Sequence, residues 1–226
     1  MAVLRFLVHA VWCLVLLAVI PPAALSFVAA LKVLGGRVLA GGTESWFVAG
    51  AVVFVPVGWW LRRWLDFWFA LAHELSHAVT GTALGARPLK LHATAGGTGA
   101  VSFHGPRALY WVVLLAPYVV NPSQALVLLV PWLRPEALSW GACAAGAGLG
   151  FALVSNLIQV RLYQKDLREA GLVRSFLFIL WGNLMVAGIM VQIVLGTGFA
   201  RLPHHLATSF SVGLWRGVYA CLAIPR

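Results

Sequence analysis

The stretch AHELSHAVTG, residues 72–81, places two histidines and a glutamate at a spacing suited to metal chemistry. On a helix, positions i and i+4 lie on one face, so His73 and His77 can direct both imidazoles at one metal ion. Glu74 projects about 100° further around the helix, given about 3.6 residues per turn. There it can act as a general base toward a water at the metal. The pattern predicts a zinc site of the kind used for peptide hydrolysis.

The chain around this motif is strongly apolar. Of its 226 residues, 62% are hydrophobic and only 10% are charged, and the mean hydropathy is +0.91. A soluble domain is typically about half apolar and about a quarter charged. Ionisable side chains inside hydrocarbon are costly and are normally functional. We therefore interpret the motif as a metal site in an integral membrane protein, in preference to three satisfied core groups.

The basic charge of the chain indicates contact with lipid. Formal net charge is +10, from 16 Lys and Arg against 6 Asp and Glu. The basic residues are scattered through short connections between apolar runs, a pattern typical of topology determinants and of contact with anionic headgroups. There is no dense basic stripe, so we expect no nucleic-acid partner. The three cysteines lie far apart in apolar context, which argues against a disulfide framework.

Apolar segments near the length of about 20 residues that spans a bilayer predict about six transmembrane helices, or seven. The expected segments cover about 6–34, 46–60, 65–84, 108–133, 137–160 and 175–195. Residues 199–226 are expected either to span the bilayer or to lie at its interface, because Arg216 stands near the centre of this apolar tail.

Residues 85–106 interrupt the helical pattern. PLKLHA and AVSFHG are short strand-like runs on either side of a GGTG turn, which predicts a β-hairpin. At membrane depth such a re-entrant loop survives only where protein buries it or where it lines a wet cavity. The predicted fold class is an all-α polytopic membrane protein with a glycine-rich β-hairpin loop that could be re-entrant.

The segment AHELSHAVTGTALGARPLKLHATAGGTG resembles the first active-site region of the site-2-protease class of intramembrane zinc metalloproteases. In that class H-E-x-x-H lies in a transmembrane helix, a glycine such as Gly85 ends the helix, and a glycine-rich re-entrant β-loop follows. The resemblance implies a zinc endopeptidase that cleaves membrane proteins or transmembrane peptides, with Glu74 as general base. It also implies that the loop, with Gly96 and Gly97, orders substrate backbone by strand addition.

The apolar runs predict one integral membrane domain over residues 1–226. Within it, the resemblance implies N-terminal helices over 6–62 and a protease core over 63–198, with 199–226 as the interfacial or spanning segment.

Two histidines leave the site incomplete, because zinc enzymes of this type use three protein ligands. In the resembled class the third ligand is an aspartate in an L-D-G motif, which this chain lacks. Asp66 lies about two turns before His73 and is poorly placed. We predict Asp166 as the third ligand, since it stands just before the sixth segment, the equivalent place in chain order; the alternative is a solvated loop residue. Asn156, inside the fifth segment, is another candidate ligand or a partner of one.

The resembled class also has an asparagine shortly after a glycine-proline pair, which helps to hold substrate. Here APYVVNP offers Asn121 after Pro117, with alanine in place of the glycine and a different spacing. Asn121 is expected either to bind substrate backbone or to cap the helix broken at Pro122. These departures favour an alternative function, a non-proteolytic membrane scaffold or assembly factor that retains the protease fold.

Charge counting predicts an orientation. If the motif and Asp166 meet, the loops after the third and fifth segments share one side, and counting segments places Lys32 and Arg37 there too. This side carries more Lys and Arg, so it should be cytoplasmic. We expect the site to open toward the cytoplasm from a bacterial-type inner or plasma membrane, with the N-terminus on the opposite side.

Overall fold

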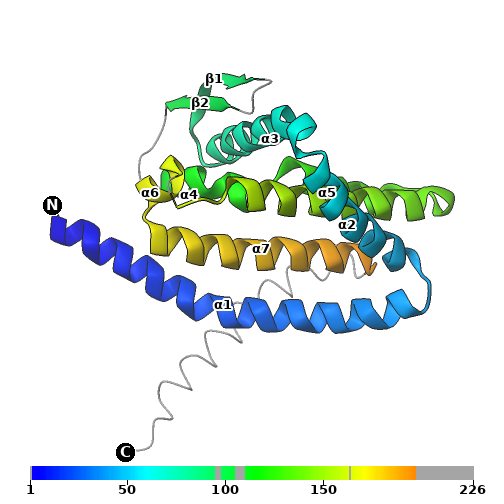
Figure 1. Cartoon of the computed structure of the whole chain (residues 1–226). Coiled ribbons are helices and arrows are strands. Elements are labelled where there is room, and N and C mark those ends of the chain that lie inside the picture. The colour runs from blue at the N-terminus through cyan, green and yellow to red at the C-terminus, as the bar shows by residue number, and fades with distance from the viewer. Residues whose placement is uncertain (1, 95–97, 105–109, 163, 197–226) are drawn as a thin grey trace, which may run out of the picture.

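A computed structural model describes residues 2–94, 98–104, 110–162 and 164–196 of the chain (Figure 1). The described part is mainly helical and carries one two-stranded antiparallel hairpin. In chain order the elements are α1 (Ala2–Leu39), α2 (Thr43–Trp60), α3 (Arg62–Ala83), β1 (Arg87–Ala93), β2 (Gly99–His104), α4 (Tyr110–Leu115), the 3-10 helices η1 (Ala116–Tyr118) and η2 (Pro122–Trp132), α5 (Pro135–Gln159), α6 (Lys165–Ala170) and α7 (Leu172–Val194).

Three of the described helices, α1, α5 and α7, are long and apolar enough to cross a membrane. Two bent pairs, α2 with α3 at 110° and α4–η1 with η2 at 72°, raise the number to five if each pair is one span. These values agree with the expected class of helical membrane protein. The expected six or seven spans are not confirmed, and the expected segment 199–226 lies outside the described residues.

Helices α1 and α7 run side by side (Figure 1). Contacts between them show which residues lie at each end of the bundle. At one end, a Cβ on Gly171 would lie 3.6 Å from Cε1 of His9. At the other end, Arg37 Nη1 donates to the Leu195 carbonyl and to Glu44 Oε1, both at 3.0 Å. The N-terminus of α1 therefore lies beside the start of α7, and Arg37 lies beside its end.

This arrangement differs from the one that charge counting assumed. Asp166 lies in α6, just before α7, and Arg37 lies at the far end of α7, so the two residues are at opposite ends of that helix. The N-terminal end of α1 lies at the same end of the bundle as the start of α7, whereas charge counting placed it on the side opposite Asp166. The difference comes from counting 46–60 and 65–84 as two spans, whereas α2 and α3 are a bent pair that can form one.

Local contacts accompany the bend at Leu61. Arg62 donates from Nη1 to the Trp59 carbonyl at 3.1 Å, and its guanidinium carbon lies 5.1 Å from the Trp59 ring centroid. The side chain thus adds a donor to a carbonyl in the last turn of α2. Neither glycine nor proline stands at the bend itself, so the sequence gives no turn signal here.

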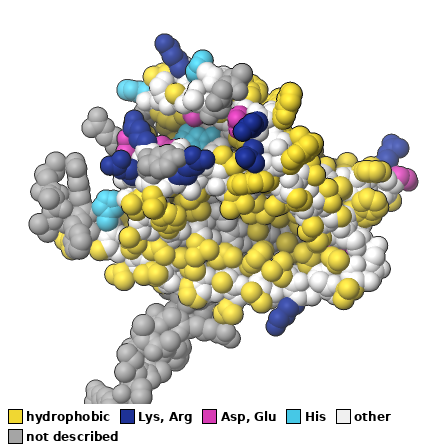
Figure 2. All heavy atoms as spheres, viewed as in Figure 1, with side chains coloured by type: hydrophobic (Ala, Val, Ile, Leu, Met, Phe, Trp, Pro, Cys, Tyr) yellow, Lys and Arg dark blue, Asp and Glu magenta, His cyan; other side chains and the backbone are white. Residues whose placement is uncertain are grey.

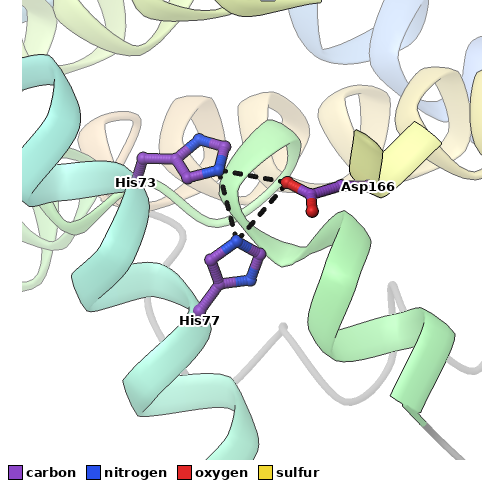
Figure 3. Close-up of side chains that lie close together, drawn as sticks. All are labelled: His73, His77 and Asp166. Carbon is purple, nitrogen blue, oxygen red and sulfur yellow. Dashed lines mark hydrogen bonds and ion pairs between the residues drawn. The ribbon is translucent and has the colours of Figure 1, made fainter. Parts of the chain in front are cut away.

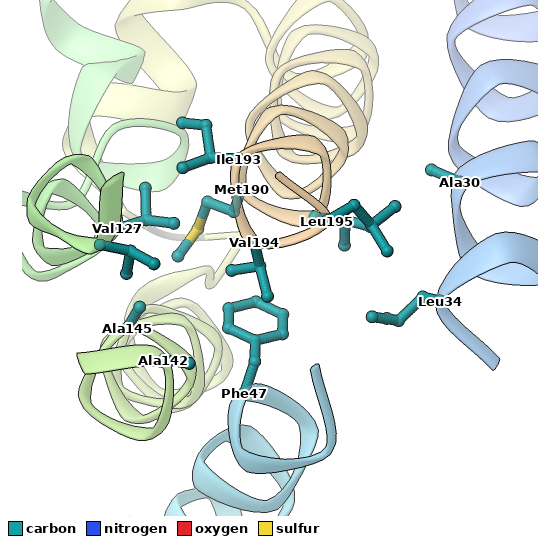
Figure 4. Packing of buried hydrophobic residues seen from close by; sticks show 12 residues of the cluster. Ala30, Leu34, Phe47, Val127, Ala142, Ala145, Met190, Ile193, Val194 and Leu195 are labelled. Carbon is teal, nitrogen blue, oxygen red and sulfur yellow. The ribbon is translucent and has the colours of Figure 1, made fainter. Parts of the chain in front are cut away.

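Small residues bring α2 and α5 into backbone contact. A Cβ on Gly50 would lie 2.1 Å from the Cys143 carbonyl oxygen, and one on Gly146 would lie 1.9 Å from that of Phe47. Such close approach is the usual way in which helices pack in membranes. Phe47 then enters an apolar cluster with Ala142, Ala145, Met190 and Val194 (Figure 4). This cluster lies toward the end of α7 where Arg37 is found.

At the opposite end, the predicted hairpin covers α3. Strands β1 and β2 pair antiparallel from Arg87 with His104 to Ala93 with Gly99. The Phe103 ring packs on Gly81, where a Cβ would lie 2.6 Å from Cε1. Helix α3 ends as expected, because Gly85 adopts a φ of 80° and the Ala86 N–H bonds back to the Gly81 carbonyl.

The corrected topology predicts where reagents reach the chain. In a cysteine-free background, an N-terminal tag and Lys165→Cys should be accessible from the same side of the membrane, and Leu39→Cys from the other. Leu39 and Lys165 suit this test because both are strongly exposed. The measurement is labelling with a membrane-impermeant maleimide. A tag and Lys165→Cys found on opposite sides would contradict the arrangement of α1 and α7.

Candidate metal centre

The structure brings His73, His77 and Asp166 together (Figure 3). The two imidazoles project from one face of α3, and the carboxylate approaches them from α6. His73 Nε2 lies 3.2 Å from His77 Nε2 and 3.3 Å from Asp166 Oδ2. His77 Nε2 lies 3.6 Å from the same Oδ2. Two residues one turn apart on α3 and a third about ninety positions later in the chain thus converge on one point.

The triangle of ligand atoms has the size that a zinc ion requires. Tetrahedral zinc binds nitrogen and oxygen at about 2.0–2.1 Å, so its ligand atoms lie about 3.3–3.4 Å apart. The three separations found here, 3.2, 3.3 and 3.6 Å, bracket that value. These residues could therefore hold a metal ion with a fourth position left open, and the His₂Asp set fits zinc.

The other ring nitrogen of each histidine is held by the protein. His77 Nδ1 lies 2.7 Å from the Val113 carbonyl oxygen, and His73 Nδ1 contacts Oε1 of Gln159. The Gln159 amide is oriented because its Nε2 donates to the Phe69 carbonyl at 3.2 Å. Acceptors at both Nδ1 atoms place the proton there and leave each Nε2 lone pair for a metal.

The Asp166 carboxyl is held in its ionised form. Burial raises the pKa of this carboxyl, but when the Nε2 atoms carry protons in place of a metal, the hydrogen bonds and charges of His73 and His77 outweigh burial and hold that pKa well below its usual range. Helix α6 is anchored by Leu167 and Ala170, which are fully buried against α4 and η1. The two turns of α6 therefore fix the carboxylate over the histidines.

Glu74 lies beside the triangle in a cavity of about 310 Å³. The cavity is lined by α3, β2, α4 and α6, and in Figure 2 histidine side chains are visible in a hollow with Lys and Arg around it. The start of β2 touches the glutamate, since a Cβ on Gly99 would lie 2.4 Å from Glu74 Cγ and 2.7 Å from Oε1. Glycine at 99 is thus what allows the strand to approach the carboxylate.

The remaining predicted residues fall outside this triangle. Asn121 is buried and caps η2, accepting from the Ser123 N–H at 3.1 Å, so the capping alternative is the one that the structure shows. The Asn156 amide donates to the Tyr118 carbonyl at 3.0 Å. Gly96 and Gly97 lie outside the described residues. Asp66 is not part of the ligand group.

Sequence reasoning missed Gln159 and Tyr118. The Tyr118 hydroxyl lies 3.5 Å from Asp166 Oδ2, and its ring meets the His73 ring edge-on at 5.4 Å between centroids. Neither residue has a spacing that relates it to the motif. The one available signal was the polar amide of Gln159 at the end of an otherwise apolar segment.

The two aspartates of the chain provide a matched test of the metal centre. Asp166→Ala should lose most of the zinc bound by the purified protein, because it removes one of three ligands. Asp66→Ala removes the same group from the same fold and should bind as much zinc as the unaltered protein. The measurement is metal content by mass spectrometry after dialysis. Equal zinc in both variants would show that Asp166 is not a ligand.

Comparisons with family models, with curated proteins and with solved structures find no match for this chain. Function is therefore inferred from the geometry of the site.

Proposed function

We propose that the chain is an intramembrane zinc metalloendopeptidase. The observation that carries this proposal is the His73–His77–Asp166 triangle with the Glu74 carboxylate beside it in one cavity. A zinc ion held there would supply Lewis acidity, polarising a peptide carbonyl and lowering the pKa of a water toward about 7. Three protein ligands with an open fourth position are typical of catalytic zinc sites, whereas structural sites use four.

Glu74 is the general base in this proposal. It follows His73 directly on α3, it is buried, and it lines the same cavity as the ligand atoms. From that position its carboxylate takes a proton from the attacking water and then delivers a proton to the leaving amine. The peptide C–N bond breaks, and the water oxygen becomes part of the new carboxylate. Gly99 keeps the space around Glu74 free of a side chain.

Strand β2 provides the place for the substrate backbone. It lines the cavity with Gly99, Ala100, Val101 and Phe103, while β1 pairs along its other edge. A third strand that pairs with the free edge of β2 would run past Glu74, which the start of β2 touches. A helix of the substrate would have to unwind to pair in this way, which suits a membrane-embedded peptide presented at the end of the bundle.

The distribution of charge supports a cytoplasmic location for the site. The end of the bundle with the metal centre holds the basic residues of the hairpin and of the chain around α6. These are Arg87, Lys90, Arg161, Lys165, Arg168 and Arg174. The opposite end holds Lys32, Arg37 and Arg134, at the end of α1 and the start of α5. Arg62 and Arg63, at the bend between α2 and α3, are assigned to neither end. Under the positive-inside rule this distribution supports a cytoplasmic location for the metal end and the N-terminus.

One observation favours the alternative of a non-proteolytic scaffold. The Asn121 side-chain oxygen, expected to bind substrate, accepts hydrogen bonds from the N–H and hydroxyl of Ser123. If this oxygen is committed to the cap of η2, the substrate must be held by β2 alone. A scaffold would use the same bundle without turnover.

Glu74→Gln separates the two functions. The amide keeps the size of the side chain but cannot accept the proton, so cleavage should fall by at least about 100-fold, within the contribution usual for general base catalysis. Zinc content should be unchanged, since Glu74 is not a ligand. The probe is a library of synthetic transmembrane peptides in detergent, with products identified by mass spectrometry.

The control is Glu136→Gln, because Glu136 lies in the first turn of α5 at the opposite end of the bundle. It should cleave like the unaltered protein. Cleavage by Glu74→Gln at the normal rate would exclude the proposed mechanism. Zinc binding by the unaltered protein without any cleaved peptide would favour the scaffold.

A further inference from the structure

The break between η1 and η2 leaves the Tyr118 backbone carbonyl without its helical partner. In a continuous α-helix the Tyr118 carbonyl would accept from the N–H of residue 122, four positions later. That residue is Pro122, which has no N–H. In a membrane environment an unpaired carbonyl is costly, so the protein must supply another donor.

Two asparagines from different helices supply donors to this carbonyl. Asn156 Nδ2 of α5 lies 3.0 Å from the Tyr118 oxygen, and Asn183 Nδ2 of α7 lies 2.6 Å from it. The two amides also bond to each other, from Asn156 Nδ2 to Asn183 Oδ1 at 3.2 Å. Both stand within helices that could span the membrane, where polar side chains are rare and usually functional.

The side chain of Tyr118 connects this hydrogen-bonded carbonyl to the metal centre. Tyr118 is fully buried, so the packing around it fixes the position of its ring. The hydroxyl lies 3.5 Å from Oδ2 of Asp166, the same oxygen that faces both histidines. This separation is longer than the 2.5–3.0 Å usual for an O–H···O bond. Hydrogen bonds of this kind often tighten only when the complete site is assembled.

We infer that Asn156 and Asn183 hold Tyr118 so that its hydroxyl positions Asp166 Oδ2 for the metal. Tyr118 is a positioning residue, and the two asparagines act through it. This inference rests on the metal centre of the proposed function and adds residues from α5 and α7 that it does not include. It also assigns a role to Asn156 as a holder of Tyr118, in place of the third ligand.

The first test removes a single oxygen. Tyr118→Phe keeps the buried ring and should weaken zinc binding about 10- to 100-fold, the usual effect of losing a partner of a metal ligand. The measurement is competition with a chelator of known affinity, together with the absorption spectrum of the cobalt-substituted protein, which reports ligand geometry. Tyr110→Phe is the matched control, because Tyr110 lines the same cavity without a described bond to a ligand. It should bind zinc as the unaltered protein does.

The second test asks whether the asparagines act through the hydroxyl. Asn156→Ala and Asn183→Ala should each weaken zinc binding, and each should add little to Tyr118→Phe in the double variant. Additive losses would show that Asn156 acts on the metal directly and would overturn the inference. Unchanged zinc affinity and cobalt spectrum in Tyr118→Phe would overturn it as well, even if the asparagine variants failed to fold.

These results separate the inference from the proposed function. If the unaltered protein binds no zinc, the metal centre itself is wrong and the inference falls with it. If the unaltered protein binds zinc and Tyr118→Phe binds it equally well, the centre stands and only the positioning role fails.

Discussion

The structure depends on one constraint: polar groups inside an apolar bundle must find their partners within the protein. The Tyr118 carbonyl, freed by Pro122, is paired by Asn156 and Asn183. The Nδ1 atoms of the two motif histidines are paired by a carbonyl and by an amide from α5. Each of these hydrogen bonds joins two different helices. The contacts that pair buried polar groups therefore also hold the imidazoles of His73 and His77 in place, without a long polar segment in the sequence.

The ligands could be predicted because their signals are local. His73 and His77 need only the helical repeat. Asp166 was predicted from the resemblance, which implies an aspartate before a later core helix, and from its place before a later apolar segment. Their convergence in space agrees with that prediction. Gln159, Tyr118 and Asn183 could not be found in this way, because their contacts span at least forty residues and follow no spacing. The strongest long-range signal was simply a polar residue in an apolar run, as for Asn156.

The hairpin and most helix positions were also predictable, since glycine turns and apolar runs mark them. The orientation of the N-terminus was not. It depended on whether 46–60 and 65–84 cross the membrane separately or form one bent pair, as α2 and α3 do. Joining the two into one span moves every earlier loop to the opposite side of the membrane. Neither glycine nor proline stands at the bend at Leu61, so the sequence does not mark it.

The distribution of polar groups between the two ends of the bundle bears on whether the protein is an enzyme or a scaffold. Helix packing depends on the end with Phe47, Gly146 and Met190, where apolar contacts and close backbone approach suffice. The other end holds a buried glutamate, two histidines and an aspartate around a cavity, which packing alone does not require. Burying such groups is costly unless they are paired or bind metal. Gly99 lets β2 lie close to the Glu74 carboxylate, because a Cβ at this position would lie 2.4 Å from Glu74 Cγ. The proposed peptidase would use each of these features: three side chains that could hold a metal, a carboxylate beside them, and a strand close to both.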